Sequence, residues 1–174
     1  MAIQLSKGGR INLTKQEPGL IKVGIGLGWD TNQYAGAQFD LDASVFMIGE
    51  NGKIPNDNFF IFYNNLLSPD QAVEHKGDNR TGAGDGDDET VYVTLNITNP
   101  EISEILFIAT IHDGEIRKQN FGQIKNAYIR IYNLATGEEI AKYELDDDST
   151  YETGIEFGRL DNQDSGRWFI APGP

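Results

Sequence analysis

Two acidic segments contain the side chains best suited to chemistry, and the first is a glycine-rich loop. It reads Asp78-Asn-Arg-Thr-Gly-Ala-Gly-Asp-Gly-Asp-Asp-Glu89, so oxygen-bearing side chains are interspersed with glycines. Glycine permits the tight and left-handed turns that wrap a backbone closely around an ion. Hard cations such as calcium take about six to eight oxygen ligands, from carboxylates and carbonyls. The loop therefore predicts a metal site of the calcium type.

The second acidic segment is the start of an expected strand, Phe39-Asp-Leu-Asp-Ala-Ser44. Along a strand, Asp40, Asp42 and Ser44 point to one side, because alternate residues share a face. Two carboxylates in an otherwise hydrophobic strand are costly to bury without compensation. A cation shared with the glycine-rich loop would compensate them. An acidic glycine-rich loop alone is often only a solvated turn, and an Asp-x-Asp pair alone is common by chance. The prediction of a metal site therefore rests on the two segments together.

Composition excludes several classes of protein. The chain has 174 residues and a formal net charge of −13, whereas a nucleic-acid binder needs clustered Lys and Arg to displace counterions. Cysteine is absent, which excludes disulfides, thiolate metal sites and cysteine nucleophiles. No apolar run resembles a signal peptide or a membrane helix. We expect a cytoplasmic protein that binds no nucleic acid and does not insert into a membrane.

Most of the hydrophobic pattern has the two-residue period of strands. In Val91-Tyr-Val-Thr-Leu-Asn-Ile97, for example, apolar residues occupy alternate positions. The pattern predicts an all-β fold, an antiparallel β-sandwich with one or two short helices, in a single domain that covers residues 1–174. The expected strands lie at residues 20–27, 39–48, 59–63, 91–97, 105–111, 127–132, 139–145, 151–160 and 167–170.

Three finer expectations follow from local sequence. The continuous apolar runs at 59–63 and 105–111 are expected to be central strands covered on both faces. A turn is expected at Ser68-Pro-Asp-Gln-Ala-Val73 and a brief helix at 117–125. Gly24-Ile-Gly-Leu-Gly28 lacks the spacing of a dinucleotide-binding motif and indicates a twisted or bulged strand with close backbone packing.

The chain resembles the TerD family of tellurium-resistance and general-stress proteins. The resemblance covers essentially the whole sequence. The residues that carry it are Leu5-Ser-Lys-Gly-Gly9, Gly28-Trp-Asp30, Phe39-Asp-Leu-Asp-Ala-Ser44 and the acidic signature from His75 to Glu89. It implies a β-sandwich that binds calcium through the loop and the aspartates of the preceding strands.

Carried over residue by residue, the resemblance implies two calcium ions. The implied ligands are Asp78, Asp85, Asp87 and Glu89, with Asp40, Asp42 and Asp88 completing or bridging a second ion, and Asp30, Asn79 and Thr81 as further candidates. Trp29 is interpreted as a packing residue rather than a ligand-stacking one, and His75 and His112 as structural or surface residues. The acidic run Glu144-Leu-Asp-Asp-Asp148 is interpreted as a solvated loop.

The function expected from this pattern is that of a non-catalytic stress-response protein, in which the metal orders the acidic loop to form an interaction surface. Its expected partners are calcium and other stress or tellurite-resistance proteins.

One alternative is a metal-dependent phosphohydrolase that uses the Asp40/Asp42 pair. In such phosphatases a hydrophobic strand precedes the motif, but here Thr31-Asn-Gln-Tyr-Ala-Gly-Ala-Gln38 precedes it, and residues 23–52 contain no Lys or Arg. Another alternative is a binder of a nucleotide or a tellurium oxyanion, for which the negative charge is unfavourable unless bound calcium reverses it locally.

Overall fold

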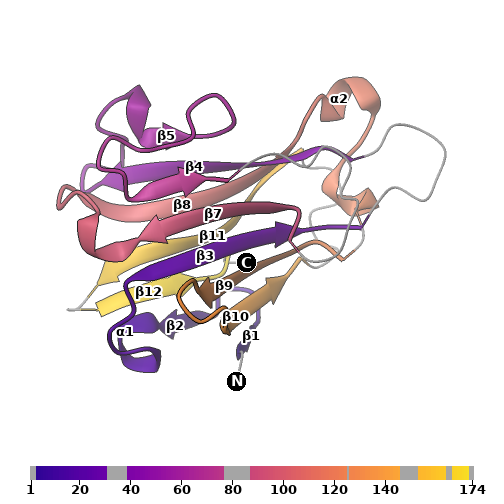
Figure 1. Cartoon of the computed structure of the whole chain (residues 1–174). Coiled ribbons are helices and arrows are strands. Elements are labelled where there is room, and N and C mark those ends of the chain that lie inside the picture. Colours follow the sequence, from indigo (N-terminus) through magenta and orange to yellow (C-terminus); the bar gives the residue numbers. More distant parts are fainter. Residues whose placement is uncertain are drawn as a thin grey trace.

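The strands form two stacked sheets of six strands each, which confirms the predicted all-β sandwich (Figure 1). The computed structural model describes residues 3–30, 39–76, 87–124, 126–145, 153–163 and 166–172. In spatial order, sheet A contains β1 (Ile3–Leu5), β10 (Glu139–Glu144), β9 (Tyr128–Asn133), β3 (Lys22–Gly28), β7 (Glu89–Thr94) and β6 (Val73–His75). Sheet B contains β2 (Arg10–Asn12), β12 (Gly166–Ile170), β11 (Gly154–Gln163), β8 (Ile102–Ile111), β4 (Leu41–Gly49) and β5 (Phe60–Ile61).

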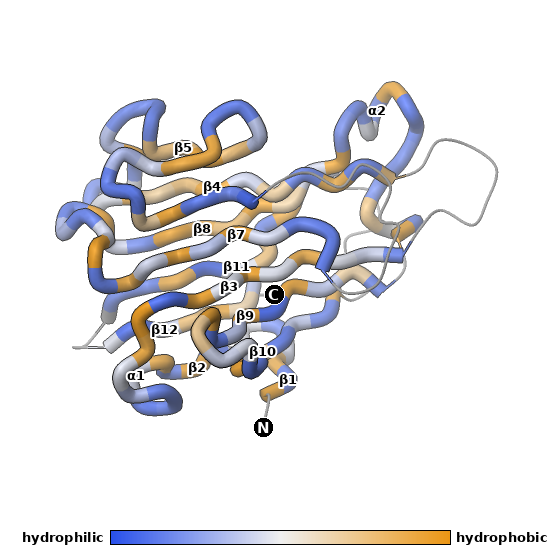
Figure 2. Tube along the Cα trace, in the orientation of Figure 1, coloured by the Kyte–Doolittle hydropathy of each residue, from blue (hydrophilic) through white to orange (hydrophobic). Residues whose placement is uncertain are grey.

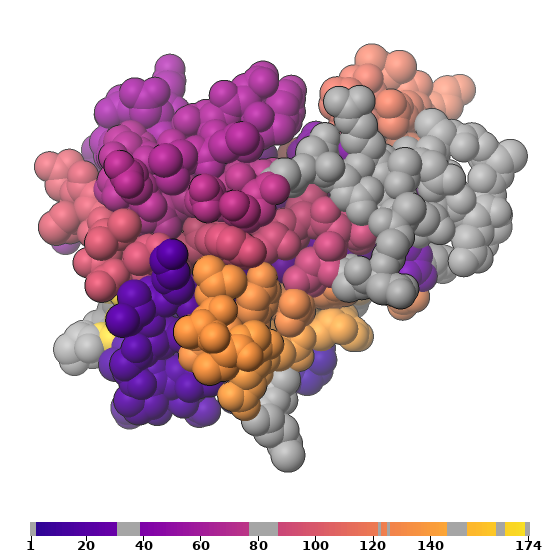
Figure 3. Space-filling view, viewed as in Figure 1, coloured from indigo at the N-terminus to yellow at the C-terminus, as the bar shows by residue number. Residues whose placement is uncertain are grey.

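The strand pairing is antiparallel in both sheets except at one edge of sheet A. There β1 pairs with β10 in parallel, whereas the other paired strands of the described chain are antiparallel. This pairing places the N-terminal segment beside the β9–β10 hairpin, and the indigo and orange atoms are neighbours in Figure 3. The three-residue strands β1, β2 and β6 were not predicted, because they are too short for alternation to be recognised.

Helical structure is limited to short turns at the ends of strands. The α-helices are α1 (Leu13–Gln16) and α2 (Gly114–Arg117), and the 3₁₀ turns are η1 (Asp57–Phe59), η2 (Leu95–Ile97) and η3 (Phe121–Gln123). Of the brief helix predicted at 117–125, the structure has only the 3₁₀ turn η3, because α2 ends at Arg117 and Lys118 follows in the left-handed conformation. The turn predicted from Ser68 is confirmed by the hydrogen bond that the Gln71 amide donates to the Ser68 carbonyl, 2.9 Å long.

The core lies between the sheets and is filled by alternate strand residues. Val23 and Ile131 of sheet A and Val45, Met47 and Phe169 of sheet B have no exposed surface. Burying each side chain of this size contributes about 1.5–3 kcal/mol to stability. Figure 2 shows the same pattern as hydrophobic residues interspersed with hydrophilic ones along the long strands.

The two apolar runs expected to be covered on both faces behave differently. Strand β8 is central, between β11 and β4, as predicted, but its Leu106 and Ile108 are only half-buried on the outer face of sheet B. The run at 59–63 is wrongly predicted as central, because β5 is a two-residue edge strand. Its aromatic character is explained by stacking, since the Phe60 ring lies 4.6 Å from that of Phe46 and 4.7 Å from that of Phe62.

Candidate metal centre

Several acidic residues are brought together at one end of the sandwich, where β3 ends and β4 and β7 begin (Figure 1). Two hydrogen bonds join these segments to one another, and a third joins the start of β4 to the residue that follows β8. The Trp29 indole nitrogen donates to the Phe39 carbonyl at 3.2 Å, and the Trp29 amide donates to Asp88 Oδ2 at 3.0 Å. The His112 amide donates to the Asp40 carbonyl at 2.7 Å. Trp29 is buried in the core cluster, which confirms its predicted packing role.

Asp40 and Asp42 lie at the start of β4, but the strand positions only the second of them. Asp42 pairs with Thr110 of β8 and faces the outer side of sheet B, where its Oδ2 atom lies 4.0 Å from His112 Nδ1. Asp40 precedes the first residue of β4, so strand alternation does not fix its direction, and it is buried, with 7% of its surface exposed. Sequence reasoning placed both on one row of the strand. In the structure the two carboxylates have different surroundings.

Asp88 is held at the bend that leads into β7. Its amide donates to the Leu27 carbonyl at 2.8 Å, and its carboxylate accepts the Trp29 amide. Burial raises the pKa of Asp88, the Trp29 hydrogen bond lowers it, and the nearby carboxylates of Asp87 and Asp30 raise it further. The result is a raised pKa, which marks a place where negative charge is concentrated and poorly hydrated. A bound cation would relieve both effects.

Asp30 lies beside this bend. Its Oδ2 atom accepts a hydrogen bond from the Asn126 side-chain amide at 2.7 Å. Asn126 has a positive φ of 55°, which is common for asparagine in a tight turn before a strand. The structure thus places Asp30 where its charge acts on Asp88, as the pKa of Asp88 reflects.

Glu89 points into the sandwich and joins its two sheets. It is the first residue of β7, pairs with Leu27 of β3, and has only 2% of its surface exposed. Its Oε2 atom accepts the backbone amide of Ala43 in β4, and it lies 3.9 Å from Nε2 of the buried His75. Buried polar groups are costly unless they are hydrogen-bonded, so this contact satisfies both a carboxylate and an amide of sheet B. His75 and the more exposed His112 fit their expected structural and surface roles.

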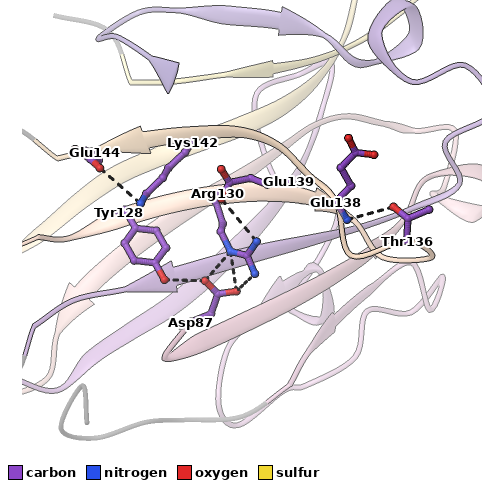
Figure 4. A network of polar contacts seen from close by, with 8 residues as sticks. All are labelled: Asp87, Tyr128, Arg130, Thr136, Glu138, Glu139, Lys142 and Glu144. Atoms are coloured by element: carbon purple, nitrogen blue, oxygen red, sulfur yellow. Dashed lines mark hydrogen bonds and ion pairs between the residues drawn. The ribbon is translucent and has the colours of Figure 1, made fainter. Parts of the chain in front are cut away.

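Asp87 lies on the outer face of sheet A in a network of charged hydrogen bonds (Figure 4). Its Oδ1 atom accepts the Tyr128 hydroxyl and Arg130 Nε, both at 2.9 Å, and its Oδ2 atom accepts Arg130 Nη2 at 2.7 Å. The Arg130 side chain also lies 3.7 Å from Glu139 and over the Tyr132 ring, 4.3 Å from its centroid. The Asp87 hydrogen bond, which outweighs partial burial, raises the pKa of Arg130.

The glycines of β3 make room for this network. Gly24, Gly26 and Gly28 pair with Tyr132, Arg130 and Tyr128 of β9 in an unbroken register, so of the two alternatives, a twisted or a bulged strand, the bulge is not found. The predicted close packing is confirmed. A Cβ atom on these glycines would lie 2.1 Å from the Tyr132 ring, 2.3 Å from Asp87 and 2.4 Å from the Tyr128 ring, respectively.

Sequence reasoning did not single out Tyr128 and Arg130. The available signal was the alternation of Tyr128-Ile-Arg-Ile-Tyr132, which matches the glycine alternation of β3 at the same period. Two strands with complementary small and large residues on one face are candidates for pairing. The register that brings Arg130 to Asp87, however, is a property of the folded sheet.

The described residues include Asp30, Asp40, Asp42, Asp87, Asp88 and Glu89 of the predicted ligand set. Asp78, Asn79, Thr81 and Asp85, and Asp146 to Asp148 of the predicted solvated run, lie outside them. Within the described ranges, no group of three or more His, Cys, Asp or Glu side chains is arranged to hold a metal ion. A complete site would therefore need oxygens from outside these described residues as well.

Comparison with known proteins identifies the family. The TerD domain matches residues 1–173. The chain belongs to the TerD family. Relatives include the tellurium resistance protein TerD of Serratia marcescens, 47% identical, and general stress protein 16U of Bacillus subtilis (strain 168), 51% identical; each alignment covers 97% of this chain and 87% of the relative. The TerD family is thus associated by these names with tellurium resistance and the general stress response.

Solved structures support the same fold. A homologue of telluride resistance protein (TerD) from Streptomyces coelicolor A3(2) is 20% identical and superposes with a TM-score of 0.69, over 90% of this chain and 91% of the other. A second structure, of a protein of unknown function, has a TM-score of 0.70 at 23% identity, over 89% and 88% of the two chains. Among the described residues, no helix is long and apolar enough to cross a membrane.

Proposed function

We propose that this TerD-family chain is a calcium-binding, non-catalytic stress-resistance protein of the cytoplasm. In this proposal, calcium held between the glycine-rich acidic loop and the start of β4 creates a surface for other stress or tellurite-resistance proteins. The names of its relatives support a role in resistance or stress. The calcium and the interaction surface are inferred from the chemistry of the site.

The available donors match a hard cation. The described part of the site offers carboxylate oxygens from Asp30, Asp40, Asp42 and Asp88, and the loop adds Asp78, Asn79 and Asp85. Calcium prefers carboxylate and carbonyl oxygens, about six to eight of them, whereas softer metals favour thiolates, and the chain has no cysteine. Bound calcium would supply positive charge to these carboxylates, and no chemical step is required of it.

One observation carries the proposal. The hydrogen bond from the Ala43 amide to Glu89 brings the start of β4 against the start of β7. Asp42 and Asp88 are the neighbours of these two residues, so acidic segments 46 residues apart in sequence meet at one end of the fold. Burial and the nearby carboxylates of Asp87 and Asp30 raise the pKa of Asp88, and a bound cation would oppose both effects.

Calcium binding would also change the net charge of the protein. Two bound calcium ions would change the formal charge from −13 to about −9. Most of that change would occur at one end of the sandwich. A partner would therefore meet a different surface in the presence of calcium than in its absence.

Thermal unfolding with calcium and with EDTA tests the proposal directly. A ligand that binds only the folded state stabilises it by about 2.7 kcal/mol at one hundred times its Kd. For a chain of this size, we expect the Tm to rise by about 5–10 °C with calcium. An unchanged Tm across a broad range of calcium concentrations would refute calcium binding.

Matched variants locate the site. Asp42→Asn and Asp85→Asn each remove one negative charge and should abolish most of the calcium-dependent shift. Asp57→Asn, at an exposed position beside β5, makes the same charge change and should leave the shift intact. Equal loss in all three variants would mean that calcium responds to net charge rather than to a site.

The phosphohydrolase alternative is less well supported by the structure. Besides the metal ion, phosphoryl transfer commonly uses a Lys or Arg that binds the transferred phosphate. Arg130, which lies at this end of sheet A, already has its guanidinium bonded to Asp87. Turnover of an aryl phosphate with magnesium, lost in Asp40→Asn, would favour the enzyme over the binding protein.

A further inference from the structure

Asp87 belongs to the acidic signature, yet its contacts differ from those of Asp88 and Glu89, the other acids of the signature that the structure describes. Both of its oxygens accept hydrogen bonds from Arg130, and one of them also accepts the Tyr128 hydroxyl. The Asp87 side chain is 9% exposed and that of Arg130 26%. A paired fork of this kind is the strongest ordinary contact between a carboxylate and a side-chain cation. Asp87 and Arg130 together add no net charge to the site.

The sheet is shaped to hold Asp87 at this position. Gly26 lies directly beneath the carboxylate, and the Tyr128 and Tyr132 rings lie over the flanking glycines. Arg130 is itself held by Glu139 and by the face of Tyr132. Each of these contacts forms among described residues and needs no metal ion.

The contacts of Asp87 restrict the orientation of the next residue, Asp88. Immediately after Asp87, the Asp88 amide bonds to the Leu27 carbonyl at 2.8 Å. The Asp88 carboxylate then turns toward the Trp29 amide, on the side of the Asp30 charge. With Asp87 fixed on the outer face and Glu89 fixed between the sheets, Asp88 has little freedom to point elsewhere.

We propose that Asp87 is a positioning residue rather than a calcium ligand, and that Arg130 clamps it to sheet A so that Asp88 is presented to the metal. The inference rests on the proposed calcium site. It narrows the ligand set suggested by the family resemblance, in which Asp87 was counted as a ligand. Arg130, although positively charged, then favours the binding of a positive ion.

The proposal predicts the direction in which the loss of Arg130 changes the affinity for calcium. Removing a nearby positive charge would by electrostatics alone strengthen calcium binding. Losing a hydrogen-bonded support of a metal ligand instead weakens metal binding, by about tenfold or more. Calcium chloride titrated calorimetrically into the calcium-free full chain should therefore bind about tenfold more weakly to Arg130→Gln. Stronger binding to Arg130→Gln would overturn the proposal.

Two further variants separate geometry from charge. Arg130→Lys keeps the charge but loses the planar fork, so it should also bind calcium more weakly, and wild-type affinity in this variant would contradict the clamp. Arg159→Gln is the matched control, because Arg159 pairs with Glu104 and Glu156 on sheet B and the substitution changes the charge by the same amount. Its calcium affinity should equal that of the wild type. An equal weakening in this control would show that the effect is not specific to the clamp.

A measurement without calcium keeps this inference distinguishable from the proposed function. Hydrogen exchange of the Asp88 amide in EDTA should be at least about tenfold faster in Arg130→Gln than in the wild type, because the clamp holds that hydrogen bond closed. Amides in the centre of β8 should be unchanged. An unchanged Asp88 rate would overturn the clamp. If Arg130→Gln shows the faster exchange but the wild type gives no heat on calcium titration, the calcium proposal is refuted and the clamp stands.

Discussion

Replacing Gly26 with alanine should disrupt the contact on which the Asp87 anchor depends. A Cβ atom at this position would lie 2.3 Å from both Cγ and Oδ2 of Asp87. Non-bonded carbons in contact are separated by about 3.5–4.0 Å, so the carboxylate must move by more than about 1 Å. The backbone itself imposes no obstacle, since Gly26 does not have a positive φ. The perturbation therefore acts through the side chain of Asp87.

Three contributions set the size of the effect. Overpacking costs about 1–3 kcal/mol. Weakened hydrogen bonds to a charged group cost up to about 1.5–3 kcal/mol, with a reduction because Arg130 is partly exposed to water. Alanine also restricts the unfolded chain, which returns about 0.4–1 kcal/mol. We expect a net destabilisation of about 2 kcal/mol, or a fall in Tm of about 4–8 °C.

Urea and thermal unfolding in EDTA measure this effect without any contribution from calcium. The decisive comparison repeats Gly26→Ala in an Asp87→Ala background, where the clashing atoms are absent and the substitution should be neutral or slightly stabilising. Gly154→Ala in β11 is a control, because its nearest contact is the Thr110 methyl group at 3.3 Å. If Gly26→Ala destabilises both backgrounds equally, the clash with Asp87 is not the cause and the reasoning is refuted.

Two other predictions concern carboxylates with different surroundings. Glu89→Ala should cost about 2–4 kcal/mol, because it opens a cavity and leaves the Ala43 amide without this acceptor, whereas Glu89→Gln keeps an acceptor and should cost much less. Urea unfolding would show the difference, and equal losses would mean that the hydrogen bond is unimportant. At Glu104, burial, opposed by Arg159 and reinforced by nearby carboxylates, raises the pKa above its ordinary value of 4.5. The neutral form therefore stabilises the fold below pH 4.5, and this contribution is lost as the pH rises through the folded pKa. Glu104→Gln should thus be more stable than the wild type at pH 7, with the advantage shrinking toward pH 4, and an advantage independent of pH would contradict the assignment.

The sandwich could be predicted because its strands alternate at the two-residue period. Strand β9 alternates clearly, and its two buried isoleucines face the core as the sequence indicated. The same pattern could not predict which strands lie at the edge of a sheet. Residues 59–63 are as hydrophobic as a central strand, but the rings of Phe60 and Phe62 stack beside Phe46 on an outer face. One sequence cannot tell burial between layers from stacking on a surface.

The sequence by itself determined the all-β class and the acidic segments, and its resemblance to the TerD family was decisive because the acidic signature is long. Periodicity and composition are local properties, so they can be read without coordinates. Only the tertiary structure separated the acids by role. Asp87 bonds to Arg130, 43 residues away, and Glu89 reaches Ala43, 46 residues away, on the opposite sheet. Such partners depend on strand register and on how the sheets stack, so three consecutive acids in the chain acquire three different environments in the fold.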